Sequence, residues 1–402
     1  MKLPLAGIRV IELGTHVAVP MIARSMADWG AEVIKVESIK GDEWRMFGKG
    51  YSVPANDDEN PVFSGQNANK QFVAINLKTD EGLDILFKLL ATADVFVSNV
   101  RMKSLKKMGL DYDTLKERFP QLVYAHLNGY GQKGPDAERP GFDKSAFWAR
   151  SGILIDCAYA DGYPMDPIAG FGDSIVGSIM LAGVLAGLIG RDRTGKGTFV
   201  ASSLYGCAIW HVNLGIISSQ EAFGDKYPKD YMYPPFPFSH IYQCKGGDWL
   251  IITIIDHDKW YEPMCRILGM EEYINDERFK TLKEVKKNEH AFVSMLKERF
   301  LTKTRQEWCR ILDENDMAHE CLNSFADISK DPQAWENNYL KKVTFPSGTE
   351  AVMPCNPISF SSYDSADVKP TRGIGCDTTH ILEGLGYSPE KIGQLREAGT
   401  IK

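Results

Sequence analysis

The sequence lacks the cysteine pairs and the blocks of like charge that mark several protein classes. Its eight cysteines are scattered with no C-x-x-C pair, which disfavours a disulfide framework and a zinc site. Charges of both signs are spread along the chain and sum to −7, so nothing indicates a nucleic-acid or membrane-surface partner. We expect reduced core cysteines and no bound metal.

Motifs of common enzyme classes are also missing. No metal-ligand spacing occurs among the eight histidines, and there is no P-loop and no serine or cysteine hydrolase signature. Residues 1–10 lack the basic segment and apolar stretch of a signal peptide, which predicts a cytoplasmic protein.

One apolar segment requires a membrane test. Residues 174–189 are almost uncharged, and Gly183 and Gly187 have the spacing of a membrane-helix contact motif. The segment has 16 residues, fewer than the roughly 20 that span a bilayer. It therefore predicts a buried core helix and no membrane association.

The first half of the chain alternates strand and helix patterns. We expect strands at residues 8–13, 32–37, 72–76, 94–100, 122–127 and 198–202, and helices at 20–28, 79–93 and 111–119. This alternation predicts an α/β fold with a mostly parallel sheet and helices on both faces.

Length and composition indicate more than one domain. A chain of 402 residues exceeds the usual single-domain size, and 44% apolar residues are enough for a sizeable core. Residues 227–238 contain four prolines, which favours an extended linker. We place a large Rossmann-like domain at 1–225, the linker at 226–240, a small α+β domain at 241–331, and a return to the large domain at 332–402.

The first strand-turn-helix unit resembles a dinucleotide-binding site but fails its main test. The turn has one glycine, Gly14, where the fingerprint needs three. A nicotinamide cofactor is therefore not expected, although an NAD-dependent oxidoreductase stays open as an alternative. The N-H groups of a helix that begins here could bind a ligand phosphate, and His16 could assist, with a structural role as the alternative.

Asp173 lies in the sequence GFGDSIVG, just ahead of the apolar helix. On pattern alone, a helix N-cap is favoured for this acid. The functional alternative uses the same geometry: the helix N-terminus would keep the carboxylate ionised, and the neighbouring glycines would let a substrate approach it. Asp143, another loop acid before a helical stretch at 144–150, has the same two interpretations.

Together these motifs resemble a known family, the class III coenzyme A transferases, which includes formyl-CoA and carnitine CoA-transferases and α-methylacyl-CoA racemase. The resemblance extends over nearly the whole chain. Its landmarks are PLAGIRVIEL at 4–13, GAEVIKVE at 30–37, Asn69-Lys70, NLKT at 76–79, Asn99, MGL at 108–110, GYG at 129–131, GDS at 172–174 and TGKG at 194–197.

The resemblance implies a fold and a mechanism. Each subunit would be a ring with a large Rossmann-like domain, and two subunits would interlock as a homodimer. Asp173 would attack an acyl-CoA thioester and pass through an aspartyl anhydride and an aspartyl-CoA thioester. Acyl-CoA and carboxylic acids would be the substrates, with no permanently bound cofactor.

The family's coenzyme A contacts transfer residue by residue to this sequence, and Asp143 matches an acidic active-site position. The matching coenzyme A positions are His16, Val17, Ala18, Ile75, Lys78, Asn99, Val100, Lys107 and Met108. The sequence departs from the family at Ser38, where an Arg often faces the coenzyme phosphates; Lys40 is a candidate replacement. The glycine-rich loop of the formyl-CoA enzyme is not visible.

Within the family, the sequence is most similar to the cinnamoyl-CoA:phenyllactate branch, whose enzymes charge (R)-2-hydroxy acids during amino-acid fermentation. The racemase branch has a His directly before the acid that matches Asp143, and here that residue is Phe142. Racemization is therefore disfavoured, and a noncatalytic acyl-CoA-binding protein is the remaining alternative. Phe147, Trp148 and the aromatic residues at 231–238 would suit an apolar substrate pocket, with ordinary packing as the alternative.

Overall fold

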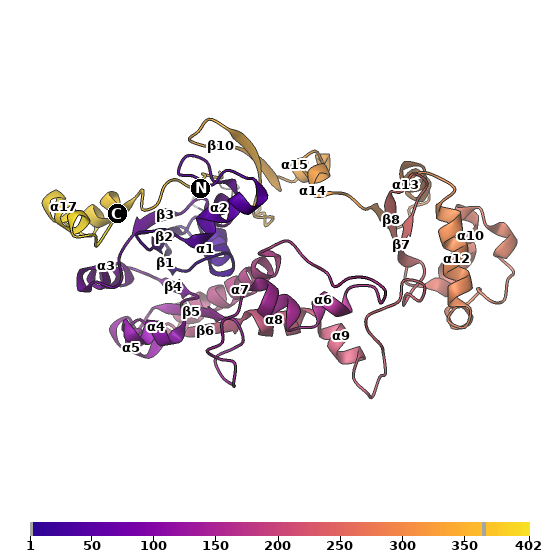
Figure 1. Cartoon of the computed structure of the whole chain (residues 1–402), viewed down its shortest axis with the longest axis horizontal. Helices are drawn as coiled ribbons and strands as arrows, with labels where there is room; N and C mark the ends of the chain where they lie inside the picture. Colours follow the sequence, from indigo (N-terminus) through magenta and orange to yellow (C-terminus); the bar gives the residue numbers. More distant parts are fainter. Residues whose placement is uncertain (1–2, 364–366) are drawn as a thin grey trace. The chain divides into compact units, whose positions relative to one another are not determined.

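The computed structural model describes residues 3–363 and 367–402. The chain forms two compact units (Figure 1). Unit 1 comprises Met1–Gly152, Asp166–Ile217 and Pro332–Lys402, and unit 2 comprises Ile153–Met165 and Ser218–Asp331. Residues 153–165 and 218–225, which the predicted boundaries assign to the large domain, thus group with unit 2.

The secondary structure follows the expected alternation through the first half of the chain. The strands are β1 (Arg9–Leu13), β2 (Glu32–Glu37), β3 (Gln71–Ala74), β4 (Val95–Ser98), β5 (Val123–Asn128), β6 (Phe199–Ser203), β7 (Ser239–Gln243), β8 (Trp249–Thr253), β9 (His319–Cys321), β10 (Leu340–Thr344) and β11 (Glu350–Pro354). The helices are α1 (Ala18–Asp28), α2 (Pro61–Asn67), α3 (Asp80–Leu90), α4 (Met102–Lys107), α5 (Tyr112–Arg118), α6 (Ile153–Asp156), α7 (Phe171–Thr194), α8 (Leu204–His211), α9 (Asn213–Ser218), α10 (His257–Leu268), α11 (Leu282–Val285), α12 (Glu289–Phe300), α13 (Arg305–Glu314), α14 (Phe325–Ile328), α15 (Pro332–Glu336), α16 (Thr378–Gly384) and α17 (Pro389–Glu397). Two 3-10 helices (Glu43–Tyr51 and Glu271–Tyr273) and a π-helix (Asp143–Ala149) complete the structure.

Unit 1 is built on a six-stranded sheet in the order β3-β2-β1-β4-β5-β6. Every neighbouring pair is parallel, so the predicted Rossmann-like sheet is confirmed. The chain moves outward from β1 in one direction and from β4 in the other, which makes the β1–β4 boundary the topological switch point. Ligands of such sheets bind outside the carboxyl ends of the strands at this point, where Leu13 lies beside Ser98.

Apolar residues on both faces hold the sheet between helices. Alternate strand residues such as Ile11 and Phe96 share one core cluster with Leu86 of α3 and Leu115 of α5. On the opposite face, α1 and α7 pack against each other and against the strands. Burial on both faces explains why these strands read as continuous apolar runs.

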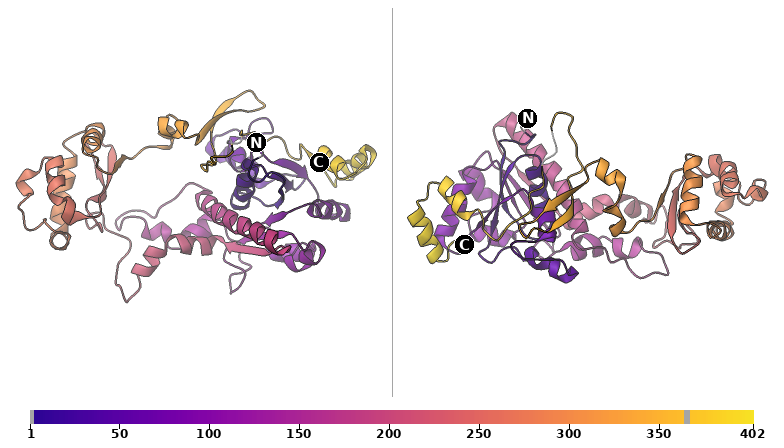
Figure 2. Two further views of the ribbon diagram at one scale, coloured as in Figure 1. Left: turned by 180° about the vertical axis from the view of Figure 1, so that it is seen from behind. Right: turned by 90° about the horizontal axis from the view of Figure 1, so that it is seen from above.

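Helix α7, the long magenta helix in the left view of Figure 2, extends beyond the predicted core helix at both ends. By length and composition it could cross a membrane, but half of its most apolar stretch is buried within the chain's own fold. Gly177 allows the close approach to α1, because a Cβ there would lie 2.8 Å from Met21 Cβ. Ile179 and Ile189 are 38% and 55% exposed, so the expectation of a buried helix is correct for one face only.

The end of the chain returns to the first sheet. Ile401 forms a β-bridge with Ile75, and the Lys402 N-H donates to the Ala74 carbonyl at 3.2 Å. Helix α16 contacts β3, and Figure 1 shows the yellow C-terminal helices beside this edge of the sheet. The last helices therefore belong to the same core as the first strands.

Unit 2 has a separate core under an antiparallel sheet in the order β7-β8-β9. Helices α10, α12 and α13 supply buried residues such as Met264, Phe292 and Trp308, which pack with Tyr242 and Leu250 of the strands. The small α+β fold is therefore as expected. Residues 227–238 contain no helix or strand.

The turn before β6 yields a stability prediction. A Cβ on Gly197 would lie 2.0 Å from the Leu122 carbonyl oxygen and 2.7 Å from the Gln121 carbonyl carbon, so the clash could be relieved only by movement of the backbone. Gly197→Ala should lower the free energy of unfolding by about 1–3 kcal/mol. Gly393→Ala is the control, because nothing lies within 4 Å of its added Cβ in α17, so the helix should gain about 0.5–1 kcal/mol. Denaturant unfolding measures both changes, and equal stability of the two variants would contradict the packing described here.

Candidate active site at the switch point

A pocket of about 370 Å³ opens at the carboxyl ends of β1, β4 and β5. Its walls come from the turn after β1, the segment after β4, the loop after β5 and the first turn of α7. The residues that matter most for its chemistry are His16, Ala18, Asn99, Arg101, Lys106, Arg139, Phe142 and Asp173. The pocket thus lies where the sheet topology predicts a ligand site.

The turn after β1 is fixed by side chains from neighbouring segments. The Asn99 amide donates to the Thr15 carbonyl at 2.9 Å and accepts from the Thr15 N-H at 3.0 Å. His16 has a positive φ of 62°, and its N-H donates to the Asp42 carboxylate at 3.2 Å. Asn99 is therefore both a wall of the pocket and a clamp on the turn that leads to His16.

Helix α1 begins at this turn without a side-chain cap. Val17 is its N-cap residue, its side chain makes no capping hydrogen bond, and no acid occupies the first turn. Helix N-termini with unpaired N-H groups attract anions and polar oxygens. The N-H groups near Ala18 are thus available to a ligand, whereas the N-H groups of Thr15 and His16 are already used.

Asp173 is not the N-cap of α7. The N-cap is Gly170, and Asp173 occupies the third helical position. The cap is the Asp143 carboxylate, which accepts from the Gly170 N-H through Oδ2 and from the Asp173 N-H through Oδ1, both at 2.9 Å. The cap interpretation of Asp173 is therefore wrong, and so is the expectation that Asp143 caps its own helix.

Gly172 is required for this contact. A Cβ on Gly172 would lie 2.4 Å from Asp143 Oδ1 and 2.6 Å from the Phe147 ring. Only glycine therefore lets the first turn of α7 approach Asp143 so closely. The Asp143 side chain lies on a π-helix, Asp143–Ala149, which replaces the ordinary helix predicted there.

The two carboxylates differ in their hydrogen bonding. Burial raises the pKa of Asp143, while the backbone N-H groups of α7 oppose that rise. The Asp173 carboxylate receives no hydrogen bond from the residues that the structure describes, and burial, followed by the charge of Asp143, raises its pKa to about 7. The expectation that the helix N-terminus keeps Asp173 fully ionised is thus wrong, because Asp143 takes up those N-H groups.

Cationic side chains surround the outer part of the pocket. Arg101 and Lys106 come from the segment after β4, and Arg139 comes from the loop after β5. Arg139 also packs over the Tyr130 ring at 5.3 Å. These three cations outnumber the two acids of the lining, Glu138 and Asp173, so the pocket favours an anionic ligand although the net charge of the chain is negative.

The pocket brings together His16, Ala18, Asn99 and Asp173 of the predicted site. The other predicted residues do not line it. Val17 is buried beside Trp44, and Asp143 accepts from the first N-H groups of α7. Val100 and Met108 pack against the core. Ile75 is buried beside the C-terminus, Lys78 lies in the turn before α3, and Lys107 is exposed at the end of α4. Contacts from these residues to a ligand stay predictions.

Sequence reasoning missed the three cations. Lys106 follows Met102 by four residues on α4, and both line the pocket, so helical periodicity distinguishes Lys106 from Lys107. Arg139 lies in an irregular loop, where no periodicity could have identified it. Within the described parts of the chain, no cluster of three or more His, Cys, Asp or Glu side chains could hold a metal ion.

Comparison with known proteins identifies the family. Residues 5–375 match the profile of CoA-transferase family III. The chain belongs to this family and is a CoA-transferase, so CoA thioesters are its substrates. The predicted family is confirmed, and the alternatives of an NAD-dependent oxidoreductase and a noncatalytic binding protein are set aside.

Individual relatives match along nearly their whole length. The chain is 37% identical over 398 residues to (R)-2-hydroxy-4-methylpentanoate CoA-transferase of Clostridioides difficile, with 99% of each chain covered. It is 34% identical to cinnamoyl-CoA:phenyllactate CoA-transferase of Clostridium sporogenes, covering 98% of this chain and 96% of that protein. The crystal structure of a CAIB/BAIF family protein from Brucella suis has 28% identity and a TM-score of 0.81, covering 96% of this chain and all of that one.

The paired carboxylates yield a titration prediction. Asp173 should be protonated below and ionised above a midpoint of about pH 7. Asp143→Asn should move this midpoint to lower pH, because it removes the neighbouring negative charge. Carboxyl-carbon NMR of aspartate-labelled protein measures both, with Asp173→Asn assigning the signal.

Asp192→Asn is the matched control, since Asp192 lies at the other end of α7 with its side chain 69% exposed. It should leave the Asp173 midpoint unchanged. A wild-type midpoint near the ordinary aspartate value of about 4, or an unchanged midpoint in Asp143→Asn, would overturn the electrostatic coupling.

Proposed function

We propose that this enzyme transfers coenzyme A from an acyl-CoA to an (R)-2-hydroxy acid, and that Asp173 forms the covalent intermediates. The observation that supports Asp173 most directly is a buried carboxylate that borders the pocket and receives no hydrogen bond from the described residues. A carboxylate oxygen that receives no hydrogen bond has its lone pairs free to attack a thioester carbonyl.

The first half of the reaction would load CoA onto the enzyme. An Asp173 oxygen attacks the thioester carbonyl carbon, the C-S bond breaks, and CoA leaves as the thiolate. An acyl-aspartyl anhydride remains. The thiolate then attacks the aspartyl carbonyl, which releases the donor acid as its carboxylate and leaves CoA joined to Asp173 through a thioester.

The second half would run the same steps in reverse with the acceptor acid. The acceptor carboxylate attacks the aspartyl-CoA carbonyl and expels the thiolate, forming a new anhydride. The thiolate attacks the acceptor carbonyl of that anhydride, which completes the new acyl-CoA and restores the Asp173 carboxylate. Carboxylate and thiolate exchange places at each step, so no redox change occurs.

The electrostatics of the site support this chemistry. An ionised Asp173 is buried beside the ionised Asp143, and acylation turns Asp173 into a neutral anhydride or thioester. Acylation therefore removes both the cost of burying the Asp173 charge and its repulsion from Asp143, the two causes that raise the pKa of Asp173, which favours the covalent states relative to the free carboxylate. Asp143 would keep accepting from the N-H groups at the start of α7, and in this way it would position Asp173.

The pocket offers partners for both ends of an acyl-CoA. The coenzyme phosphates would be bound by Arg101, Lys106 and Arg139. Many family members use an Arg for this contact at the position that is Ser38 here. The uncapped N-H groups of α1 near Ala18 would face the oxyanion that develops on the thioester carbonyl. His16 would contact the coenzyme between these two regions.

The acceptor class rests on the relatives. Two of them are named for (R)-2-hydroxy-4-methylpentanoate and phenyllactate, and both acids carry an apolar group beyond the 2-hydroxyl. Phe142 lines the pocket and is 59% exposed, so its ring offers an apolar surface to this group of the acceptor. The interlocked homodimer, the cytoplasmic location and the fermentative role stay predictions.

A panel of acids tests the proposed function. The enzyme should transfer CoA from cinnamoyl-CoA or a branched acyl-CoA to (R)-2-hydroxy-4-methylpentanoate and (R)-phenyllactate, with kcat/KM about tenfold or more above the (S) isomers. Asp173→Ala should lose about 10³-fold or more in kcat, whereas Asp192→Ala should keep wild-type rates. Chromatography of the CoA esters measures transfer. A preference for dicarboxylic acceptors would contradict the substrate class, and normal transfer by Asp173→Ala would contradict its role.

A further inference from the structure

His16 has a backbone conformation that an L-residue rarely adopts. Its φ is 62°, in the left-handed region that glycine tolerates and other residues occupy only at a cost in free energy. Such a residue persists when its surroundings over-determine it. The question is therefore what holds His16, whose ring lies 5.6 Å from Phe142 across the pocket.

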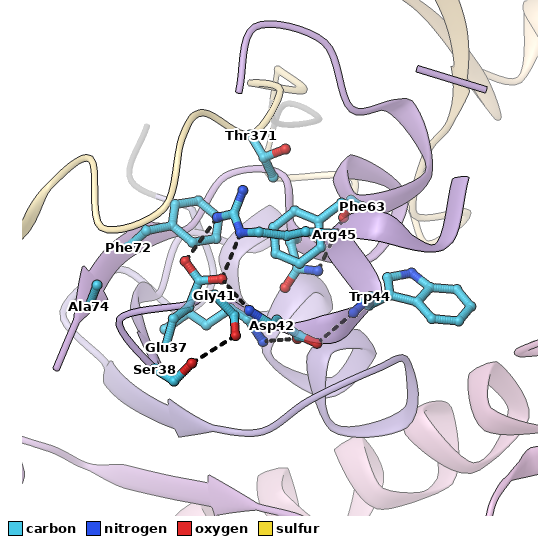
Figure 3. Close-up of polar contacts among 12 residues, drawn as sticks. Glu37, Ser38, Gly41, Asp42, Trp44, Arg45, Phe63, Phe72, Ala74 and Thr371 are labelled. Atoms are coloured by element: carbon cyan, nitrogen blue, oxygen red, sulfur yellow. Dashed lines mark hydrogen bonds and ion pairs between the residues drawn. The ribbon is translucent and has the colours of Figure 1, made fainter. Parts of the chain in front are cut away.

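Asp42 provides the one side-chain contact to the His16 backbone among the described residues. Its Oδ1 accepts from the His16 N-H at 3.2 Å and from the Trp44 N-H at 3.0 Å. Asp42 is the N-cap of the 3-10 helix Glu43–Tyr51, as Figure 3 shows with Trp44 beside it. One carboxylate oxygen therefore joins the strained turn to the start of that helix.

A buried charge network fixes Asp42 from the other side. Lys35 lies 2.9 Å from Asp42 Oδ2 and donates to Glu12 at 2.8 Å and to the Gly14 carbonyl at 2.7 Å. Lys70 pairs with the second oxygen of Glu12 at 2.7 Å. These side chains are fully buried. These buried, alternating charges hold Asp42 at a defined place, and Lys35 holds the same turn at Gly14.

We propose that Asp42 is a positioning residue for the transferase reaction: by accepting from the His16 N-H it keeps His16 left-handed, with the imidazole in the coenzyme A pocket. The inference rests on the proposed function, because it assumes that His16 contacts the coenzyme. The Asp42 carboxylate itself does not line the pocket, so it acts through His16. The His16 ring also lies 6.2 Å from Trp44, whose backbone Asp42 fixes as well.

The test compares two variants that differ only in the acceptor. Single removal of Asp42 would leave Lys35 with less compensation for its buried charge, so Lys35 is replaced by Met in both. Lys35→Met with Asp42→Asn keeps an oxygen facing the His16 N-H. Lys35→Met with Asp42→Leu has nearly the same volume but no acceptor.

The acceptor-free pair should raise KM for acyl-CoA about tenfold relative to the Asn pair, the usual effect of one lost hydrogen bond, with kcat changed less than threefold. In a His16→Gly background the two pairs should have the same KM, since the side chain that Asp42 positions is gone. The inference would be overturned if the Asn and Leu pairs had equal KM values for acyl-CoA with His16 present. It would also be overturned if their KM values differed as much in the His16→Gly background.

A second measurement decides the matter if the Leu pair does not fold. In otherwise unchanged protein, His16→Gly should melt at a higher temperature than His16→Ala, because glycine adopts the left-handed conformation without the free-energy cost that alanine pays. A lower or equal melting temperature for His16→Gly would contradict an imposed conformation. Calorimetric titration of wild-type protein with CoA separates the proposed coenzyme site from the proposed role of Asp42. If wild-type protein does not bind CoA, the coenzyme site itself is refuted. If it binds CoA but the Leu pair has the same kinetics as the Asn pair, only the role of Asp42 is refuted.

Discussion

The Asp143 carboxylate accepts the first N-H groups of α7, and the arrangement of the site depends on that contact. It joins the loop after β5 to the helix that carries Asp173 across 30 residues of sequence. Because the helix N-terminus is capped by Asp143, the Asp173 carboxylate is left without a donor, and burial, followed by the charge of Asp143, raises its pKa to about 7. The two acids therefore have different environments, as in other paired-carboxylate sites, and on this difference rests the proposal that Asp173 is the nucleophile. Gly172 is the steric condition for this arrangement, since any larger residue would displace Asp143.

The site lies at a place that the sheet dictates. Strand order reverses between β1 and β4, so the turns after Leu13 and Ser98 diverge and leave a crevice between them. Asn99 spans this crevice and fixes the backbone of Thr15. Below it, the buried charges of Lys35 and Asp42 fix the same turn. Polar groups buried in this way contribute little net stability, and here they hold the backbone of that turn in one geometry.

Much of the fold could be predicted from local sequence, because the strands are buried on both faces and the helix caps are local. Strand β2 has the predicted bounds, and α3 begins one residue after its predicted start, where the Thr79 side chain caps it by accepting from the Gly82 N-H. The capping of α7 could not be predicted in the same way. A short acid just before an apolar helix has the pattern of a local cap, and nothing in that pattern shows that an acid 30 residues earlier occupies the position.

The same limit applies to the rest of the site. His16, Asn99 and Asp173 were found through family motifs, and the structure places all three around one pocket. Arg139 and the contact from Asp42 to His16 depend on tertiary packing, which has no periodicity in the sequence. Family resemblance thus indicates candidate site residues, and only the packing shows which groups surround and orient them.

Oxygen transfer into the protein tests the covalent role of Asp173 most directly. When an acceptor acid labelled with ¹⁸O in its carboxylate reacts through an aspartyl anhydride, the bridging oxygen stays on Asp173 after CoA departs with the acyl group. Mass spectrometry of the digested enzyme should then show a gain of about two mass units for each exchanged carboxylate oxygen on the peptide containing Asp173, and on no other. An enzyme that turns over labelled acceptor many times and yet keeps unlabelled Asp173 would show that CoA passes directly between the substrates, without the carboxylate that the paired-acid geometry leaves free to react.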